Sequence, residues 1–261
     1  MINILDKICE NKKNEIINSK EKCSFSSLEK LYKESQNRNF LNLIINSQKE
    51  SKNNIIGEIK KSSPSAGEII KDYVPENIAK EYENAGIGAL SVLTDKNFFD
   101  GNLDHISIIH NNSNLPILRK DFIIDPYQIL ESKIYKADAI LLILSILDDN
   151  EVKNFIKIAE SYNLDCLIET HNEEEILRAI NIGYPIIGIN NRNLKDLSVN
   201  MNNKFKLIKK IPKDFTIIAE SGIKTKDDIS RYNDLGIFNF LIGESILKSI
   251  NIKNKIKELL S

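Results

Sequence analysis

The sequence predicts a closed (β/α)8 barrel, a TIM barrel with an N-terminal helical extension, and two observations carry that prediction. Eight short apolar runs recur along the chain, several of them rich in Ile, Leu and Val, as expected of strands buried on both faces. Successive runs begin about 20 to 35 residues apart with amphipathic segments between them, as in consecutive βαβ units. An open doubly wound sheet is the alternative, but it usually has fewer strands, and the GxGxxG motif of its dinucleotide-binding form is missing.

The first fifty residues precede the first predicted strand and contain two predicted helices. One spans Ile4–Ile17, and the second begins near Ser27, where Ser26 and Glu29 resemble a capping box. Residues 1–50 therefore form a helical extension and residues 51–261 the barrel of a single domain, 1–261, since no low-complexity linker separates them. We expect the extension either to plug one end of the barrel or to cover the active site.

The barrel elements follow in alternation. The predicted strands are Asn54–Lys60, Ala89–Thr94, Leu115–Lys120, Ala137–Leu144, Asp165–Glu169, Pro185–Asn190, Thr216–Glu220 and Asn239–Gly243. Periodic apolar residues predict helices at Glu76–Ala85, Tyr127–Tyr135, Glu151–Tyr162, Glu173–Ile182, Lys204–Ile211 and Thr225–Leu235. Three of these helices end beside Gly86, Gly183 or Gly236, and glycine there is a helix-stop signal.

Composition narrows the class of protein. The 261 residues fit one barrel, and 41% hydrophobic residues can supply its core. The net charge of −1 suggests no nucleic-acid or membrane partner, and the longest apolar stretch, Ala139–Leu147, is too short to span a bilayer. Three cysteines without CxxC spacing, and no secretory signal, predict a reducing cytoplasm, no disulfide framework and no structural zinc. We expect a cytoplasmic monomer.

Several predicted strands end in a polar residue. Side chains alternate along a strand, so Glu58 shares a face with Lys60, and Lys120 shares one with Leu118. Barrel enzymes keep their active sites at the carboxyl ends of the strands, where such groups can reach water and substrate. One catalytic pocket is therefore predicted from Glu58, Lys60, Lys120, Glu169, Asn190 and Glu220. The alternative is that these are ordinary polar strand ends, some of them only paired as ions.

The loops after the seventh and eighth predicted strands suggest a phosphate site. Ser221 and Gly222 follow one strand, and Gly243 and Glu244 follow the other, where barrels commonly bind phosphate through backbone N–H groups. Glycine permits close approach. The side chain of Glu244 should point away, because two anions repel, and only its N–H would serve. Ser63, after the first strand, could add a hydroxyl; a plain turn is the alternative there.

The histidines and Cys166 carry weaker signals. His105 and His110 lie in or near the helix after the second strand, and His171 follows Glu169 by two residues. No spacing suggests a metal, so surface or capping roles are expected for all three histidines. Cys166 lies inside the fifth predicted strand, where a buried inert thiol is expected.

In order along the chain, these strand ends resemble the signatures of the indole-3-glycerol phosphate synthase family, from about residue 55 to 247. The resembling segments are Glu58–Ser65, Ser91–Asp95 with Phe98–Gly101, Arg119–Ile123, Leu167–Glu169, Gly188–Leu194 and Ala219–Ile223. The resemblance implies the substrate 1-(2-carboxyphenylamino)-1-deoxyribulose 5-phosphate and the products indole-3-glycerol phosphate, carbon dioxide and water. It implies a step of tryptophan biosynthesis that needs no metal or organic cofactor.

The resemblance also implies roles. Lys120 would be the general acid on the substrate carbonyl oxygen, Glu169 the general base, and Lys60 would hold the substrate carboxylate or expel the hydroxyl. Glu58 would orient a lysine, and Asn190 and Glu220 would hold hydroxyls or developing charge. Substrate contacts are expected from Arg192, Ser221 and the apolar walls Phe122, Leu141 and Ile143; phosphate contacts are expected from Ser63, Gly222, Gly243 and Glu244. Neighbouring, partly desolvated lysines have lowered pKa values, whereas nearby carboxylates oppose that shift.

Three alternatives stay open. Phosphoribosylanthranilate isomerase is another phosphate-binding barrel enzyme, but that family typically pairs a Cys base with an Asp acid. A Schiff-base aldolase could use Lys120 or Lys60 and would be trapped by borohydride. A catalytically inactive binding protein would have lost pocket residues, and the main acid–base positions are all present here.

Overall fold

A computed structural model describes residues 4–193 and 197–261, apart from the side chains at 202 and 203, so Leu194 of the predicted motif lies outside the described residues. Eight parallel strands form a closed barrel in which each strand pairs with its neighbours in the chain and β1 closes against β10. The strands are β1 Asn54–Ile59, β4 Ala89–Leu93, β5 Ile117–Lys120, β6 Ala139–Ile143, β7 Asp165–Thr170, β8 Ile186–Asn190, β9 Thr216–Glu220 and β10 Asn239–Ile242. The predicted TIM barrel and all eight of its strands are confirmed.

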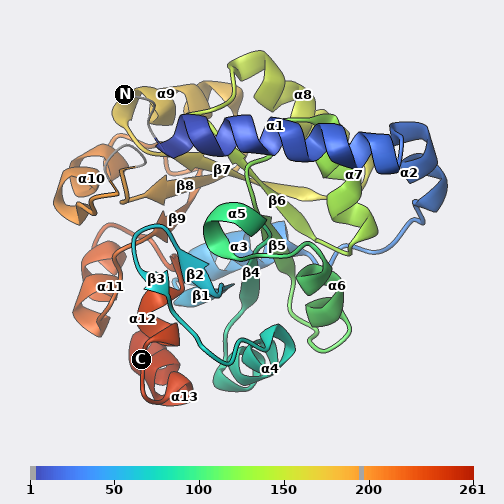
Figure 1. The fold of residues 1–261 in the computed structure, drawn as a ribbon. Helices are drawn as coiled ribbons and strands as arrows, with labels where there is room; N and C mark the ends of the chain where they lie inside the picture. Colours follow the sequence, from blue (N-terminus) through green and yellow to red (C-terminus); the bar gives the residue numbers. More distant parts are fainter. Residues whose placement is uncertain (1–3, 194–196) are drawn as a thin grey trace.

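Helices surround the barrel (Figure 1). They are α4 Pro75–Ala85, α6 Asp104–His110, α7 Pro126–Ile134, α8 Asp149–Ser161, α9 Glu173–Ile182, α10 Met201–Ile208, α11 Lys226–Asn233, α12 Glu244–Leu247 and α13 Ile252–Leu260. The strands alternate as predicted, because Ile140 belongs to the core between strands and helices, whereas Leu141 faces the barrel interior. The helix predicted at Lys204–Ile211 begins and ends three residues earlier, as α10.

Arg119 is a charged residue of β5 that is buried between the barrel and the helices. Arg119 of β5 is 3% exposed and reaches α7, where its Nη1 is 2.9 Å from Glu131, while its Nη2 lies 3.0 Å from Asp121. A buried cation is costly unless it is paired, and this one is paired twice.

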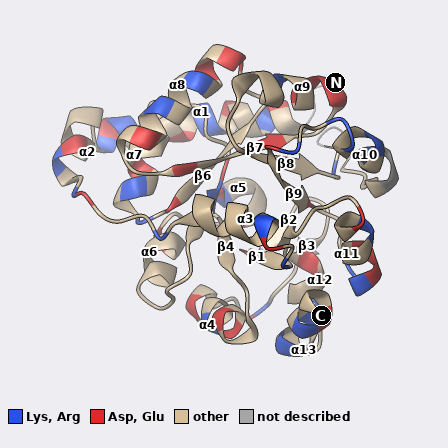
Figure 2. Ribbon diagram, turned by 180° about the vertical axis from the view of Figure 1, so that it is seen from behind, with Lys and Arg blue, Asp and Glu red and all other residues tan. Residues whose placement is uncertain are grey.

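The N-terminal extension lies over both ends of the barrel. It contains α1 Ile4–Lys22, α2 Phe25–Leu31 and α3 Phe40–Lys49. Figure 1 shows α1 across one end, and the reverse view in Figure 2 shows α3 across the other. The α3 end is the amino end of the strands, because Asn239, the first residue of β10, donates from Nδ2 to the carbonyl oxygen of Ile44 at 3.0 Å. Both predicted roles of the extension, plug and cover, are therefore present.

Details of the extension differ from the predictions. The second helix begins at Phe25, and its N-cap is Ser24, whose hydroxyl accepts from the Ser27 N–H at 3.3 Å, so the capping box at Ser26 was wrong. The helices α3, α12 and α13 and the hairpin of β2 Ser62–Ser63 and β3 Gly67–Glu68 were not predicted. A short helix, α5 Lys96–Phe99, follows β4. Within the described residues, no helix combines the length and apolarity that crossing a membrane requires.

Candidate active site

A cavity of about 1100 Å³ opens at the carboxyl ends of the barrel strands. All fifteen residues that the sequence singled out for the site line it. They are Glu58, Lys60, Ser63, Lys120, Phe122, Leu141, Ile143, Glu169, Asn190, Arg192, Glu220, Ser221, Gly222, Gly243 and Glu244. Strands that lie far apart in the chain therefore deliver their terminal side chains to one place, as the alternation along each strand requires.

Lys120, the last residue of β5, forms an ion pair with a glutamate of the cavity wall. The Nζ of Lys120 lies 2.8 Å from Oε2 of Glu169 on β7 and 3.9 Å from Oε2 of Glu220 on β9. Burial alone would lower the pKa of Lys120, but Glu169, Glu220 and Glu58 together raise it above its usual value. The carboxylates thus outweigh desolvation, and the lowered pKa expected for neighbouring, partly desolvated lysines does not apply to Lys120.

The two carboxylates beside Lys120, those of Glu169 and Glu220, differ in protonation state. Burial would raise the pKa of Glu169, but Lys120 and His171 bring it well below its usual value. Burial and the neighbouring Glu169 charge raise the pKa of Glu220 well above the normal range. Glu220 Oε1 is also buried without a hydrogen-bond partner among the described residues. The negative charge of this pair therefore resides on Glu169.

A second lysine of the cavity directly follows β1, which only β4 separates from β5 in the barrel. Lys60 donates to Glu58, and both side chains are largely buried. Asn190 ends β8, and its Oδ1 accepts from the Arg192 N–H at 3.0 Å. Arg192 in turn donates to the carbonyl oxygen of Leu197 at 2.9 Å. The cavity therefore holds a lysine–carboxylate pair on each of two sides.

The loops after β9 and β10 expose backbone to the cavity. Ser221 and Gly222 both have positive φ, 63° and 83°, which a glycine adopts without strain. A Cβ on Gly243 would come within 2.6 Å of Glu58 Oε1, so this position admits only glycine beside Glu58. The carboxylate of Glu244 lies 2.8 Å from Lys248 and 4.0 Å from Arg192. Backbone from these loops, together with Arg192 after β8 and Lys248 after α12, forms one polar end of the cavity.

The opposite part of the cavity is apolar. Phe122, Leu141 and Ile143 are buried there, and Phe99 lies 6.4 Å from Phe122 between ring centroids. The helix α1 adds Ile4, Leu5 and Ile8 to the lining. An aromatic ring with a phosphorylated tail would match this division into apolar and polar parts.

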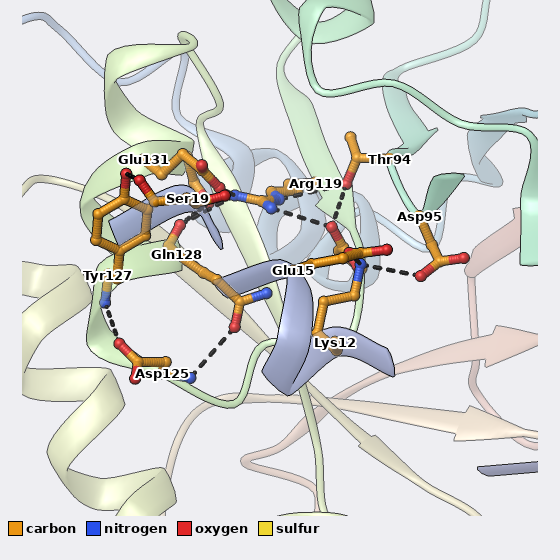
Figure 3. A network of polar contacts seen from close by, with 12 residues as sticks. Lys12, Glu15, Ser19, Thr94, Asp95, Arg119, Asp125, Tyr127, Gln128 and Glu131 are labelled. Atoms are coloured by element: carbon orange, nitrogen blue, oxygen red, sulfur yellow. Dashed lines mark hydrogen bonds and ion pairs between the residues drawn. The ribbon is translucent and has the colours of Figure 1, made fainter. Parts of the chain in front are cut away.

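A buried lysine fixes α1 over the cavity. The Nζ of Lys12 lies 2.9 Å from Asp95, which follows β4, and 3.0 Å from Asp121, which follows Lys120. Figure 3 shows Lys12 reaching toward Glu15 and Asp95, with the Arg119 network beside it. Burial would lower the pKa of Lys12, but the aspartates raise it, so the lysine stays charged. Sequence reasoning missed this residue because its partners lie on distant strands.

His171 is the second residue that sequence reasoning misplaced. A surface or capping role was expected, but its side chain is only 7% exposed and its Nε2 lies 3.1 Å from Glu169 Oε1. The available signal was its position two residues beyond Glu169, which puts both on one face of the strand. The described residues contain no cluster of His, Cys, Asp and Glu suited to a metal ion.

A closed barrel with paired acids and bases at its strand ends, and a glycine-lined polar subsite after β9 and β10, defines a TIM-barrel enzyme for a small phosphorylated substrate. A model of the indole-3-glycerol phosphate synthase family matches residues 5–259. The chain belongs to this family.

Individual relatives agree. An indole-3-glycerol phosphate synthase of Zymomonas mobilis subsp. pomaceae is 40% identical over 261 residues, covering 100% of this chain and 99% of that one. Its counterpart from Thermoanaerobacter pseudethanolicus is 45% identical over 98% of this chain and 96% of its own. Among solved structures, tryptophan synthase subunit alpha from Legionella pneumophila has a TM-score of 0.63 at 10% identity, over 86% of this chain and 97% of its own. That last likeness concerns the fold alone.

Proposed function

We propose that the cavity residues catalyse the reaction of this family in the roles given below. The chain is a carbon–carbon lyase that closes the ring of 1-(2-carboxyphenylamino)-1-deoxyribulose 5-phosphate in tryptophan biosynthesis. The products are indole-3-glycerol phosphate, carbon dioxide and water. The observation that carries the assignment of roles is the 2.8 Å contact between Lys120 and Glu169, a candidate acid beside a candidate base.

The acid and the base are in the required states before substrate binds. The raised pKa of Lys120, which Glu169 and Glu220 cause despite burial, keeps it protonated near neutral pH. The lowered pKa of Glu169, which Lys120 and His171 cause despite burial, keeps it ionised. Lys120 donates toward the carbonyl oxygen, so that the aromatic carbon can attack the carbonyl carbon. Carbon dioxide leaves, and loss of the hydroxyl as water, with a proton taken by Glu169, completes the indole ring.

The remaining residues hold the substrate. Lys60, kept in place by Glu58, either binds the carboxylate that is lost or protonates the departing hydroxyl. Asn190 and Glu220 hold hydroxyls, and Arg192 and Ser221 contact the chain between ring and phosphate. The phosphate binds to the Ser63 hydroxyl and to the backbone of Gly222, Gly243 and Glu244, and the ring packs on Phe122, Leu141 and Ile143. Fixing the chain over the ring lowers the barrier further through proximity.

The alternative activities find less support in this cavity. None of the three cysteines, all of which the structure describes, lines it, and burial raises the pKa of Cys166 well above the normal range. An isomerase with a cysteine base is therefore disfavoured. A Schiff-base aldolase needs a neutral amine as nucleophile, and the carboxylates around Lys120 keep that amine charged.

The decisive experiment follows indole fluorescence after the substrate is added to purified protein with excess chelator. The chain has no Trp, so its own background is low. Wild type should produce the signal, and Lys120→Ala should lose about 10² to 10⁴ in kcat with an unchanged circular dichroism spectrum. Lys209→Ala, on the exposed surface, is the matched control. Near wild-type activity of Lys120→Ala would refute its role as the general acid.

We further propose that the enzyme acts in the cytoplasm as a monomer. One chain supplies all fifteen proposed site residues, so the proposed roles need no second chain. The three cysteines are free thiols, which a reducing compartment preserves. Sedimentation at micromolar concentration should give the mass of a single chain, 29.8 kDa; a stable dimer would contradict the proposal.

A further inference from the structure

The imidazole of His171 lies between two carboxylates. Its Nε2 is 3.1 Å from Glu169 Oε1, and its Nδ1 is 3.3 Å from Glu175 Oε2 on α9. A neutral imidazole has one N–H and one lone pair, so one of its nitrogens would present a lone pair to a carboxylate. The doubly protonated ring carries an N–H on each side, with Nδ1 hydrogen-bonded to Glu175 and Nε2 in an ion-pair contact with Glu169. Burial would lower the pKa of His171, but Glu169 and Glu175 raise it above its usual value.

Glu175 is itself firmly held on the far side of the ring. Its Oε2 accepts from the His171 backbone N–H at 2.7 Å, and its Oε1 accepts from the Ser145 hydroxyl at 2.8 Å and from Asn172 Nδ2 at 2.7 Å. Ser145 also lies 3.2 Å from His171 Nδ1. Lys204 of α10 donates to the carbonyl oxygen of His171. The ring is thus held from the loop after β6 and from α9, and the backbone of His171 is held from α10.

The two oxygens of Glu169 therefore have different partners. Oε2 accepts from Lys120 inside the cavity, at 2.8 Å, and Oε1 faces His171 behind it. When Lys120 turns to the substrate carbonyl, His171 is the cation that stays beside Glu169. The neighbouring Glu220 would otherwise compete for the negative charge, because the two carboxylates cannot readily both ionise.

We propose that His171, oriented by Glu175 and Ser145, is a positioning residue that keeps Glu169 ionised and aimed into the cavity while Lys120 serves the substrate. The proposal rests on the role of Glu169 as general base. It differs from a helix-capping role, since capping requires only the backbone of His171 and places no charge beside Glu169. The two possibilities therefore separate in experiments that report charge.

The first experiment is an NMR titration of histidine side chains, which is simple because the chain has three histidines. His171 should titrate above 6.5, whereas burial lowers the pKa of His105 and His110 below that value. Glu175→Gln should lower the pKa of His171 and leave the other two unchanged. A wild-type His171 that titrates below 6.5 would overturn the proposal, whether or not the protein is active on the substrate.

The second experiment compares kinetics of His171→Gln with those of His105→Gln, a matched change outside the cavity. The glutamine amide can still donate to Glu169 but carries no charge. We expect kcat to fall by about 10- to 100-fold with little change in KM, the scale of a misplaced reacting group. The acid limb of kcat/KM should move up by about one pH unit, because Glu169 loses an adjacent cation.

The outcomes distinguish a failure of the proposed function from a failure of the positioning role of His171. If wild type makes no indole product, the proposed function fails, and the titration alone decides on the charge of His171. If wild type is active and His171→Gln keeps both its rate and its pH profile, the positioning role is refuted. Should His171→Gln fold poorly, Glu175→Gln replaces it, with a smaller loss of kcat and an upward shift of the acid limb expected.

Discussion

Glu244 places a negative charge at the end of the cavity that is proposed to bind phosphate, beside the cations Lys248 and Arg192. Bonding to Lys248 lowers the pKa of Glu244, with Lys60 and Arg192 contributing, so Glu244 is ionised beside the subsite proposed for an anion. The backbone N–H of Glu244 can donate to a phosphate, whereas its carboxylate repels one. The carboxylate instead occupies two cations, Lys248 and Arg192, that could contact the phosphate. We therefore expect the Glu244 side chain to weaken the phosphate subsite proposed to include its backbone.

Glu244→Gln is therefore expected to lower KM by about two- to fivefold with kcat unchanged, because an exposed charge contact is worth up to about 1 kcal/mol. Steady-state fluorescence assays at low and physiological ionic strength measure the effect, which should shrink with salt. Glu173→Gln removes a similar exposed pair with Lys210 outside the cavity and serves as control. A raised KM would mean that the Glu244 side chain binds substrate.

Residue identities at strand ends were predictable, whereas their electrostatic states were not. Alternation along a strand was enough to bring Glu58, Lys120 and Glu169 together. The pKa of Lys120 depends on how many carboxylates surround it, and that number follows from the closure of the barrel. His171 was misjudged for the same reason, since its second partner, Glu175, becomes visible only once α9 folds back onto β7.

At the scale of the elements, the position of α1 over the cavity depends on one buried charge, that of Lys12. Lys12 is 4% exposed and pairs with both Asp95 and Asp121, which are almost fully buried after the ends of two strands. Removing one partner from a buried charge cluster leaves the others uncompensated and is strongly destabilising. Since α1 also carries Ile4, Leu5 and Ile8 into the cavity lining, its anchoring couples stability to substrate binding.

Lys12→Met should accordingly lower the free energy of unfolding by about 3–5 kcal/mol and raise KM, measured by urea denaturation and by the fluorescence assay. Lys13→Met makes the same change one residue further along α1, on its exposed face, and should have little effect on either quantity. Equal behaviour of the two variants would show that α1 is not held by the Lys12 cluster.

The strands and most outer helices were predicted, because they follow apolar periods that a sequence displays directly. The short elements and the helices α3 and α13 were not predicted, although α13 is amphipathic and capped by Asn251. The helix α3 begins after Asn39, a residue type favoured at the N-cap, but Asn39 adopts a left-handed conformation and makes no capping hydrogen bond. The two-residue strands β2 and β3 are too short to show any period. Three serines, Ser24, Ser26 and Ser27, lie close together before or in α2. Only the backbone geometry shows that Ser24 is its N-cap.

At the scale of the whole molecule, the N-terminal extension belongs to the barrel core at both ends. Phe40 and Ile44 of α3 are fully buried with Ile56 and Ile186 of the barrel interior, and Ile8 of α1 joins the same cluster near the cavity. We propose on this basis that residues 1–50 and 51–261 unfold as one domain, in a single transition. The barrel nonetheless separates an end that supplies stability from an end that supplies activity.

A pair of truncations, one at each end, tests that separation. Phe40→Ala should cost about 3–5 kcal/mol of unfolding free energy, because it leaves a cavity in a close-packed core. Its kcat/KM at 25 °C should stay near that of wild type, since α3 lies at the amino end of the strands and no α3 residue lines the active-site cavity. Ile8→Ala also removes a buried side chain but opens the cavity wall, so KM should rise several-fold. A loss of kcat/KM in Phe40→Ala as large as that in Ile8→Ala, measured where both variants are folded, would show that packing at the amino end is transmitted through the barrel interior to the catalytic groups.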